Sequence, residues 1–465
     1  MSEPAPNQFA LLGTRRFLPL FIVQFLGAFN DQVYQKAFVA LVTYRLADEV
    51  GIPVAQLGVI ASALFILPFA IITPSAGQLA DRYDKAVLMR WIKAWEIVVM
   101  GLAVIGYYTQ NIYFLYFVLF LMGAQSAMFA PIKYSVLPQY LAPKELMGGN
   151  GLVQGFTFLA IIFGTILGNE LILREAGEVI DLLIISVTLP MDGVAIISTS
   201  VVAIAIVGFI AALFTPPAKP VLVNPPPVDW VFPRAIYALY AMCRQNKPAI
   251  RAILAISWFW FLGATFLSLL PAYAKEDLGV DESVLTVLLA GFSIGVAVGA
   301  VASEGLSRGR VDVNLPPIGA LGLAVMAIEL YMATPSLPFP PAPGADLADR
   351  AIFLDNAVGW RILIDFVVLA AFAGMYVTPL NAVLQAEAPD DQRASYIACS
   401  NVTDASFMVI SAAIVAILVT FGVGTTEVLV IVTLTALPMA FLVARYAPET
   451  RLGRYALALW PRGPQ

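Results

Sequence analysis

Apolar runs of about 20 residues recur along this chain, and the polar breaks between them are short. Each run is long enough to cross a bilayer as a helix. The composition agrees, because 60% of the 465 residues are hydrophobic and only 12% are charged, about half the charged fraction of soluble domains. We therefore expect an all-α membrane protein.

The pattern of apolar runs and turn residues predicts about twelve transmembrane helices. They lie near residues 17–43, 54–79, 86–108, 111–138, 148–171, 192–214, 249–274, 282–306, 316–334, 359–385, 394–422 and 425–445. The first run follows Arg15 and Arg16, as the core of a signal peptide would. It is longer than the ~7–15 residues of such a core and lacks a small-x-small cleavage site, so we expect an uncleaved helix.

A proline-rich break between residues 215 and 248 separates two sets of six helices. It continues into an amphipathic stretch from Pro233 to Gln245. The sequence therefore predicts an N-terminal six-helix bundle (1–214), a cytoplasmic linker with an amphipathic helix (215–248), and a C-terminal six-helix bundle with a cytoplasmic tail (249–465).

The two predicted bundles contain related segments. Phe25 to Ala28 in the first helix recurs as Phe261 to Ala264 in the seventh, and Pro131-x-Lys133 in the fourth recurs as Pro379-x-Asn381 in the tenth. Such echoes indicate two parallel repeats about an axis along the membrane normal, an arrangement that predicts two pseudo-symmetric bundles.

Lysine and arginine residues gather in alternate breaks, including those around Arg82, Lys144 and Arg393. The opposite breaks are acidic, and two of them, 174–190 and 335–358, are long. The positive-inside rule places the basic breaks and both termini in the cytoplasm. The net charge of −5 therefore describes the outer face, and we expect no nucleic-acid partner.

The turn after the second helix contains a conformational latch candidate. Its residues run Gly77-Gln-Leu-Ala-Asp81-Arg82-Tyr-Asp-Lys85. Gly77 would let two helices approach closely, and Asp81 with the cations Arg82 and Lys85 would form ion pairs that break as the halves rock. Arg308 and Arg310 occupy the corresponding turn of the second half. A plain positive-inside turn is the alternative.

Asp31 lies near the middle of the first predicted helix, where a charge costs ~2.5 kcal/mol or more. We therefore expect it to face a central cavity, although a static hydrogen bond between helices would also account for it. Lys133 in the fourth helix is predicted to hold a substrate phosphate or to pair with Asp31 in the empty state. Snorkelling of the lysine to the interface is the alternative.

Further polar residues are candidates for the cavity wall, although each alone is more often a contact between helices. They are Gln24, Asn30, Gln154, Asn381, Asn401 and Asp404. Lys93 and Glu96, three residues apart on one helix, are expected to neutralise each other.

The chain contains no histidine. This excludes Ser-His-Asp and Cys-His catalysis and histidine metal sites, so we expect no enzyme and no metal centre. Cys243 and Cys399 do not suggest a disulfide framework. There is no phosphate loop for ATP, so we expect no cofactor, and a gradient of Na+ or H+ would supply any energy.

These motifs resemble the lysophospholipid transporter branch of the major facilitator superfamily. The matching stretches are Gln24 to Asp31, Ala130 to Tyr134, Asn150 to Leu152, Ser257 to Gly263 and Pro379 to Gln385. The turn from Gly77 to Lys85 resembles the superfamily signature, with Asp84 where glycine is usual. Some relatives have an arginine in the seventh helix, whereas here Leu262 to Pro271 has no charge.

The resemblance implies a flippase in the bacterial inner membrane that moves lysophospholipids from the outer to the inner leaflet by alternating access, for reacylation. It also implies that Asp31 and Lys133 line the cavity, and that a cytoplasmic acyltransferase or acyl-carrier-protein synthetase could be a partner. The alternative from the residues is a cation-coupled exporter of amphipathic drugs or other small solutes, since such exporters have similarly apolar walls.

Overall fold

The computed structural model describes residues 7–46, 54–182, 185–222, 225–307, 314–337 and 347–444. Its first half contains η1 (Gln8–Gly13), α1 (Leu18–Leu41), η2 (Val42–Leu46), α3 (Val54–Arg82), α4 (Lys85–Thr109), α5 (Ile112–Ser135), α6 (Leu137–Tyr140), η3 (Pro143–Glu145), α7 (Leu146–Leu171), β1 (Val179–Leu182), β2 (Ile185–Thr188) and α8 (Gly193–Leu213).

After α9 (Phe232–Cys243), the second half contains α10 (Lys247–Ala272), η4 (Tyr273–Asp277), α11 (Glu282–Ser307), α12 (Leu315–Ala333), η5 (Thr334–Ser336), α13 (Arg350–Leu354), α14 (Ala357–Glu387), α15 (Arg393–Thr420), α16 (Thr425–Leu434) and α17 (Ala436–Ala444). The only strands in the described ranges form the antiparallel hairpin β1–β2. The predicted all-α membrane fold is therefore confirmed, with one small hairpin added.

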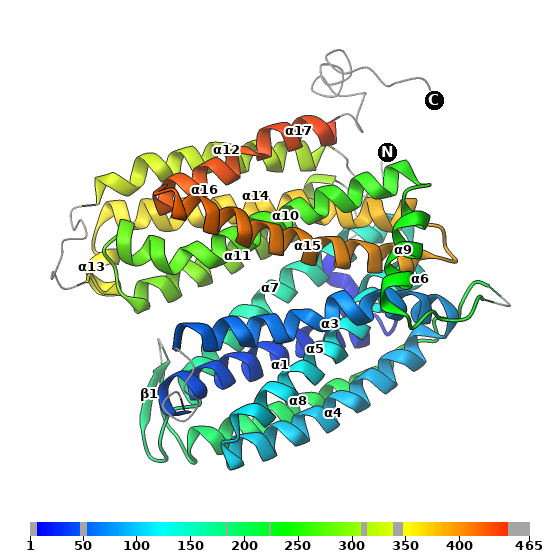
Figure 1. Ribbon diagram of the computed structural model, residues 1–465, viewed down its shortest axis with the longest axis horizontal. Coiled ribbons are helices and arrows are strands. Elements are labelled where there is room, and N and C mark those ends of the chain that lie inside the picture. Colours follow the sequence, from blue (N-terminus) through cyan, green and yellow to red (C-terminus); the bar gives the residue numbers. More distant parts are fainter. Residues whose placement is uncertain are drawn as a thin grey trace.

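Ten spans in the described ranges are long and apolar enough to cross a membrane. α1 and α4 are as long as these ten spans and lie together in one bundle (Figure 1), but they contain more polar and charged residues than the ten do. The last span is divided between α16 and α17 because Pro438 lacks the N–H that would bond to Leu434. The protein is thus a multi-pass membrane protein.

The helices form two bundles (Figure 1). The first contains α1, α3, α4, α5, α7 and α8, and the second contains α10, α11, α12, α14, α15 and the divided span α16–α17. In the first, α1 packs on α7 and α3 packs on α5; in the second, α10 packs on α15 and α11 packs on α14. The two principal contacts between the bundles, α3 with α15 and α7 with α11, follow the same correspondence. Equivalent helices thus make equivalent contacts, as parallel repeats require.

The two bundles contact each other at the end of the molecule where α3 ends and α15 begins. Helices α6 and α9 lie at the same end (Figure 1). We call this the closed end. Glycines allow the close approach, since a Cβ added to Gly151 of α7 would lie only 2.6 Å from the carbonyl oxygen of Ala300 in α11. Gln8 of η1 also links the two bundles at this end, because its side-chain amide donates to the carbonyl of Val301 at 3.0 Å.

The proline-rich segment before α9 is attached to the closed end of α3. Arg82 donates to the carbonyls of Pro225 at 2.9 Å and Pro226 at 2.6 Å, and the backbone N–H of Asp229 donates to Gln78 at 2.8 Å. The Arg234 guanidinium, hydrogen-bonded to Asp229, holds the pKa of that carboxyl below its usual value. The segment therefore has a fixed position beside the latch candidate.

Candidate functional site

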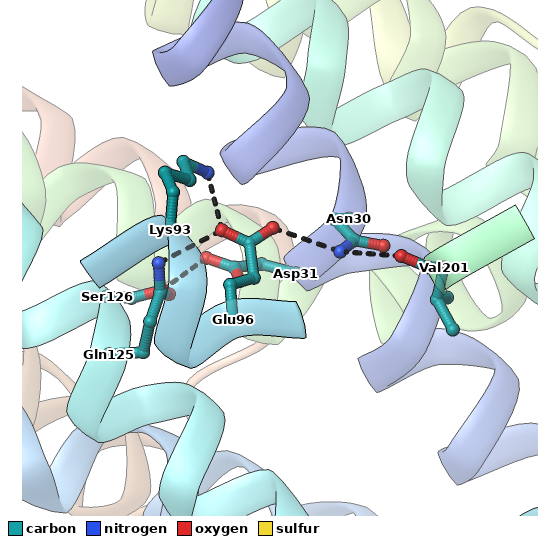
Figure 2. Close-up of polar contacts among 7 residues, drawn as sticks. All are labelled: Asn30, Asp31, Lys93, Glu96, Gln125, Ser126 and Val201. Carbon is teal, nitrogen blue, oxygen red and sulfur yellow. Dashed lines mark hydrogen bonds and ion pairs between the residues drawn. The ribbon is translucent and has the colours of Figure 1, made fainter. Parts of the chain in front are cut away.

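Asp31 lies in the middle of α1 and is half-buried. Its Oδ2 lies 2.6 Å from the hydroxyl of Ser126 on α5, which also lies 3.1 Å from Oε1 of Gln125 (Figure 2). In the part of the chain that the structure describes, Asp31 makes no ion pair. The carboxyl is held by a neutral hydroxyl, and Ser126 is a contact that the sequence did not reveal.

A buried ion pair lies beside Asp31 (Figure 2). Lys93 Nζ is 2.5 Å from Glu96 Oε2, and the two side chains are 0% and 2% exposed. The i,i+3 spacing on α4 predicted this pair. Gly27 of α1 provides the space, because a Cβ there would lie 2.8 Å from Lys93 Nζ.

Two neutral amides complete the surroundings of Glu96. Gln125 Nε2 donates to its Oε2 at 3.0 Å, and Asn30 Nδ2 donates to its Oε1 at 3.0 Å. Asn30 also donates to the carbonyl of Val201 on α8 at 3.2 Å. Glu96 thus accepts from three donors, one of them a cation, so its buried carboxylate oxygens all have partners. Asn30, a predicted cavity residue, instead points into the bundle between α4 and α8.

Lys133 reaches into the space between α1, α5 and α7. Its Nζ donates to the hydroxyl of Thr157 at 2.8 Å, and Thr157 lies 2.9 Å from Oε1 of Gln24. The ammonium also lies 5.3 Å from the ring centroid of Tyr134. Within the described residues, Lys133 pairs with a hydroxyl rather than with Asp31, so the expected Asp31–Lys133 pair is absent from this conformation.

Polar residues also bridge the two bundles at the closed end. Asn150 of α7 and Gln385 of α14 exchange two amide hydrogen bonds, at 3.0 and 2.7 Å. Gln154 accepts from Tyr134 of α5 at 2.5 Å, a contact within the first bundle. The two Asn150–Gln385 bonds must separate if the closed end opens.

The remaining candidates belong to the second bundle. Asp404 of α15 is buried and accepts from Ser257 of α10 at 2.5 Å. Asn381 donates to the carbonyl of Val377 on its own helix at 3.2 Å, and Asn401 is half-buried. The structure therefore does not bring these three side chains together with Asp31, and their role in binding stays a prediction.

Asp81 joins the two bundles at the closed end, but with different chemistry from the predicted ion pairs. Its carboxylate accepts from the backbone N–H groups of Ala394 and Ser395, each at 2.8 Å, and from the Ser395 hydroxyl at 2.7 Å. It thus binds the N-terminus of α15, where unpaired N–H groups attract an anion. Gly77 lies against Ala398, so the prediction of close helix approach there is consistent with the geometry.

Of the predicted latch cations, the two that the structure describes, Arg82 and Lys85, do not form a direct ion pair with Asp81. Arg82 binds carbonyls of the linker, and Lys85, the first residue of α4, is buried. Arg308 and Arg310 lie outside the described residues.

Sequence reasoning missed a second carboxylate at the closed end. Glu304 of α11 lies at the start of α7, with its carboxyl carbon 3.5 Å from where a Cβ on Gly148 would sit. It thus mirrors Asp81 at the start of α15. The signal was available, because the turn after α11 is the repeat counterpart of the turn after α3. In the described ranges no group of three or more His, Cys, Asp or Glu side chains could hold a metal ion.

Two six-helix bundles, repeated helix contacts and a polar interior define a two-bundle membrane transporter. A sequence model of the Major Facilitator Superfamily matches residues 20–354, and the chain belongs to this superfamily.

Curated relatives support the narrower resemblance. The lysophospholipid transporter LplT of Photorhabdus laumondii is 24% identical over 376 residues, covering 80% of this chain and 80% of that protein. The Cronobacter sakazakii protein of the same name is 26% identical over 385 residues, covering 80% and 81%. That of Serratia proteamaculans is 26% identical over 392 residues, covering 83% of each. The sequence resemblance to lysophospholipid transporters is therefore confirmed.

Solved structures share the fold. FucP in its outward conformation is 16% identical with a TM-score of 0.67, covering 93% of this chain and 99% of that one. A bacterial homologue of the iron transporter ferroportin in an outward-facing state is 15% identical with a TM-score of 0.66, covering 93% and 100%.

Proposed function

We propose that this chain moves lysophospholipids across the bacterial inner membrane, from the outer to the inner leaflet, by alternating access. Reacylation in the cytoplasm, by an acyltransferase or acyl-carrier-protein synthetase, would then consume the transported lipid. The relatives named as lysophospholipid transporters support the substrate class.

The observation that carries the proposal is the set of contacts that Lys133 makes. Its ammonium lies inside the bundle beside Thr157 and the Tyr134 ring, and no carboxylate among the described residues forms an ion pair with it. A lysine ammonium is a compact point charge suited to a phosphate. The phosphate of a lipid head group could therefore replace the Thr157 contact without first breaking an ion pair.

The second bundle provides apolar surface for a single acyl tail. Leu267 of α10, the repeat counterpart of Asp31, is 54% exposed. A lysophospholipid needs few charges and a wide apolar wall, whereas a sugar needs many hydrogen-bonding groups. The first bundle would thus hold the head group and the second the tail.

The position of basic residues at the closed end supports the proposed direction of access. Arg82, Lys85 and Arg393 lie there, and the positive-inside rule assigns such residues to the cytoplasm. With both termini cytoplasmic, the described conformation is closed to the inside. Asp81 on α15 and the Asn150–Gln385 pair would open as the halves rock to release lipid inward.

Reconstituted vesicles test the proposal. Labelled lysophosphatidylethanolamine placed in the leaflet that corresponds to the outside should appear in the other leaflet only when the protein is present. Lys133→Met should slow this movement strongly, whereas Lys219→Met, at an exposed linker position, should not. Absence of protein-dependent lipid movement would refute the proposal. Gradient-driven export of an amphipathic cation by the same vesicles would favour the exporter alternative.

A further inference from the structure

Glu304 of α11 lacks the donors that hold Asp81. Its side chain is only 4% exposed, and among the described residues its Oε2 has no hydrogen-bond partner. Asp81, at the equivalent place between α3 and α15, accepts three hydrogen bonds from the start of α15. At the start of α7, the N–H of Leu146 already donates to Pro143 of η3. Glu304 is therefore a buried carboxylate with an unpartnered oxygen, which is costly unless a positive charge neutralises it.

A pocket of about 110 Å³ lies beside Glu304, between η1 and the start of α7. Gln8 of η1 lines it, together with two further charged side chains, Arg16 and Glu145. These two form an ion pair at 2.5 Å and neutralise each other. Within the described ranges, the lining of the pocket therefore keeps one negative charge, that of Glu304.

Gln8 brings a second unpartnered oxygen to this pocket. Its Nε2 donates to the carbonyl of Val301 at 3.0 Å, whereas its Oε1 is buried and has no partner in the part of the chain that the structure describes. The side chains of Gln8 and Glu304 approach the same point, because a Cβ added to Gly148 would lie 2.8 Å from Gln8 Cβ and 3.5 Å from the carboxyl carbon of Glu304. Two acceptor oxygens cannot donate to each other, so the pair is suited to a cation.

The charge and the oxygen ligands favour an alkali-metal cation. Hard cations take carboxylate and carbonyl oxygens as ligands. A single positive charge neutralises Glu304, whereas a divalent ion would leave an excess charge buried in the pocket, which is costly. The pocket has room for such an ion together with a few waters, since a water occupies about 30 Å³ in the liquid.

We propose that the pocket between Gln8 and Glu304 binds an alkali-metal cation, Na+ or K+, and that the bound cation stabilises the closed end. The site joins both bundles, because Arg16 links the segment of Gln8 to Glu145 in the first bundle, and Glu304 belongs to α11 in the second. When α7 and α11 part, Gln8 and Glu304 separate and the site is lost. This inference does not rest on the identity of the transported lipid.

Thermal unfolding of the purified protein tests cation binding without transport. At constant ionic strength, replacing N-methylglucamine chloride by NaCl or KCl should raise the unfolding midpoint, and the rise should saturate. Glu304→Gln keeps the shape of the side chain and removes its charge, so it should abolish the rise, and Gln8→Ala should shift it to higher cation concentration. Asp365→Asn, at another buried carboxylate with an unpartnered oxygen, should respond as the unmodified protein does.

Three results of this experiment would overturn the proposal. They are an unchanged response in Glu304→Gln, no response in the unmodified protein, and a response to Mg²⁺ alone. If Glu304→Gln does not fold, the cation series on the unmodified protein and on Gln8→Ala decides the question, because a midpoint that depends equally on the cation in both proteins would contradict the site.

Maleimide labelling of Cys399 tests the effect of the cation on the closed end. This thiol is buried in α15, so it reacts when the closed end opens, and a Cys243→Ser background removes the other thiol. A cation that binds only the closed state raises the ratio of closed to open protein about tenfold at about nine times its dissociation constant. Labelling should slow by the same factor, and Glu304→Gln should label fast in every salt. Labelling that ignores the cation while the unfolding midpoint rises would overturn the link to the closed end.

Discussion

The buried Lys93–Glu96 pair allows the sharpest test of the site's construction. Glu96→Gln would leave Lys93, which is 0% exposed, as an unpaired buried cation. Removing one partner of a buried pair costs ~3–5 kcal/mol. The double change Lys93→Met with Glu96→Gln removes both charges and should cost only about 1–2 kcal/mol, the loss of a hydrogen bond.

Thermal unfolding in detergent measures these differences in a double-mutant cycle. The matched control is Glu329→Gln, whose partner Arg361 lies 2.5 Å away in a pair that is 31% and 44% exposed. That change should cost ~1 kcal/mol or less. The reasoning would be refuted if the double variant were as unstable as Glu96→Gln alone, or if the exposed pair mattered as much as the buried one.

Three further predictions concern transport and the closed end. Asp31→Asn should reduce lipid movement in vesicles more than Lys133→Arg, which keeps the charge; equal full activity in both would remove the central-site account. Asp81→Ala removes three hydrogen bonds to the start of α15, each worth ~1.5–3 kcal/mol. The closed end should then open more often, so maleimide should label Cys399, which is buried in α15, faster than in the unmodified protein. Unchanged labelling would contradict the latch. Gly151→Val should clash with the Ala300 carbonyl, 2.6 Å from the added Cβ, and reduce the population of the closed state about tenfold for each 1.4 kcal/mol of cost. Unaltered crosslinking between α7 and α11 would contradict this close approach.

Apolar run length predicted the helices well because a bilayer imposes one length on every span. The structural boundaries fall within a few residues of the predicted ones, as for 112–135 against 111–138. The break at Thr435 was not predicted, although Pro438 carries the signal. The hairpin β1–β2 was not predicted, although residues 179–189 form a run rich in β-branched residues that is too short to span a bilayer.

The site was harder to predict because its contacts join helices that are distant in sequence. Asn30 was placed beside Asp31, but neighbouring residues on a helix point about 100° apart, and Asn30 faces Glu96 instead. The spacing of Lys93 and Glu96 predicted their pair, whereas the links to Gln125 required the packing of α4 on α5.

The partner of Asp81 at the closed end could not be predicted from the sequence either. The partner of Asp81 is a set of backbone N–H groups at the start of α15. No residue type in the sequence marks that partner, so basic side chains nearby were taken for it.

The central claim is that a lysophospholipid head group binds in the first bundle at Lys133. An experimental structure with bound lysophosphatidylethanolamine tests it most directly. The account predicts density between the two bundles, with the phosphate within hydrogen-bond distance of Lys133 Nζ and the tail against α10. A head group bound in the second bundle, or lipid found only on the outer rim of the helices, would contradict it.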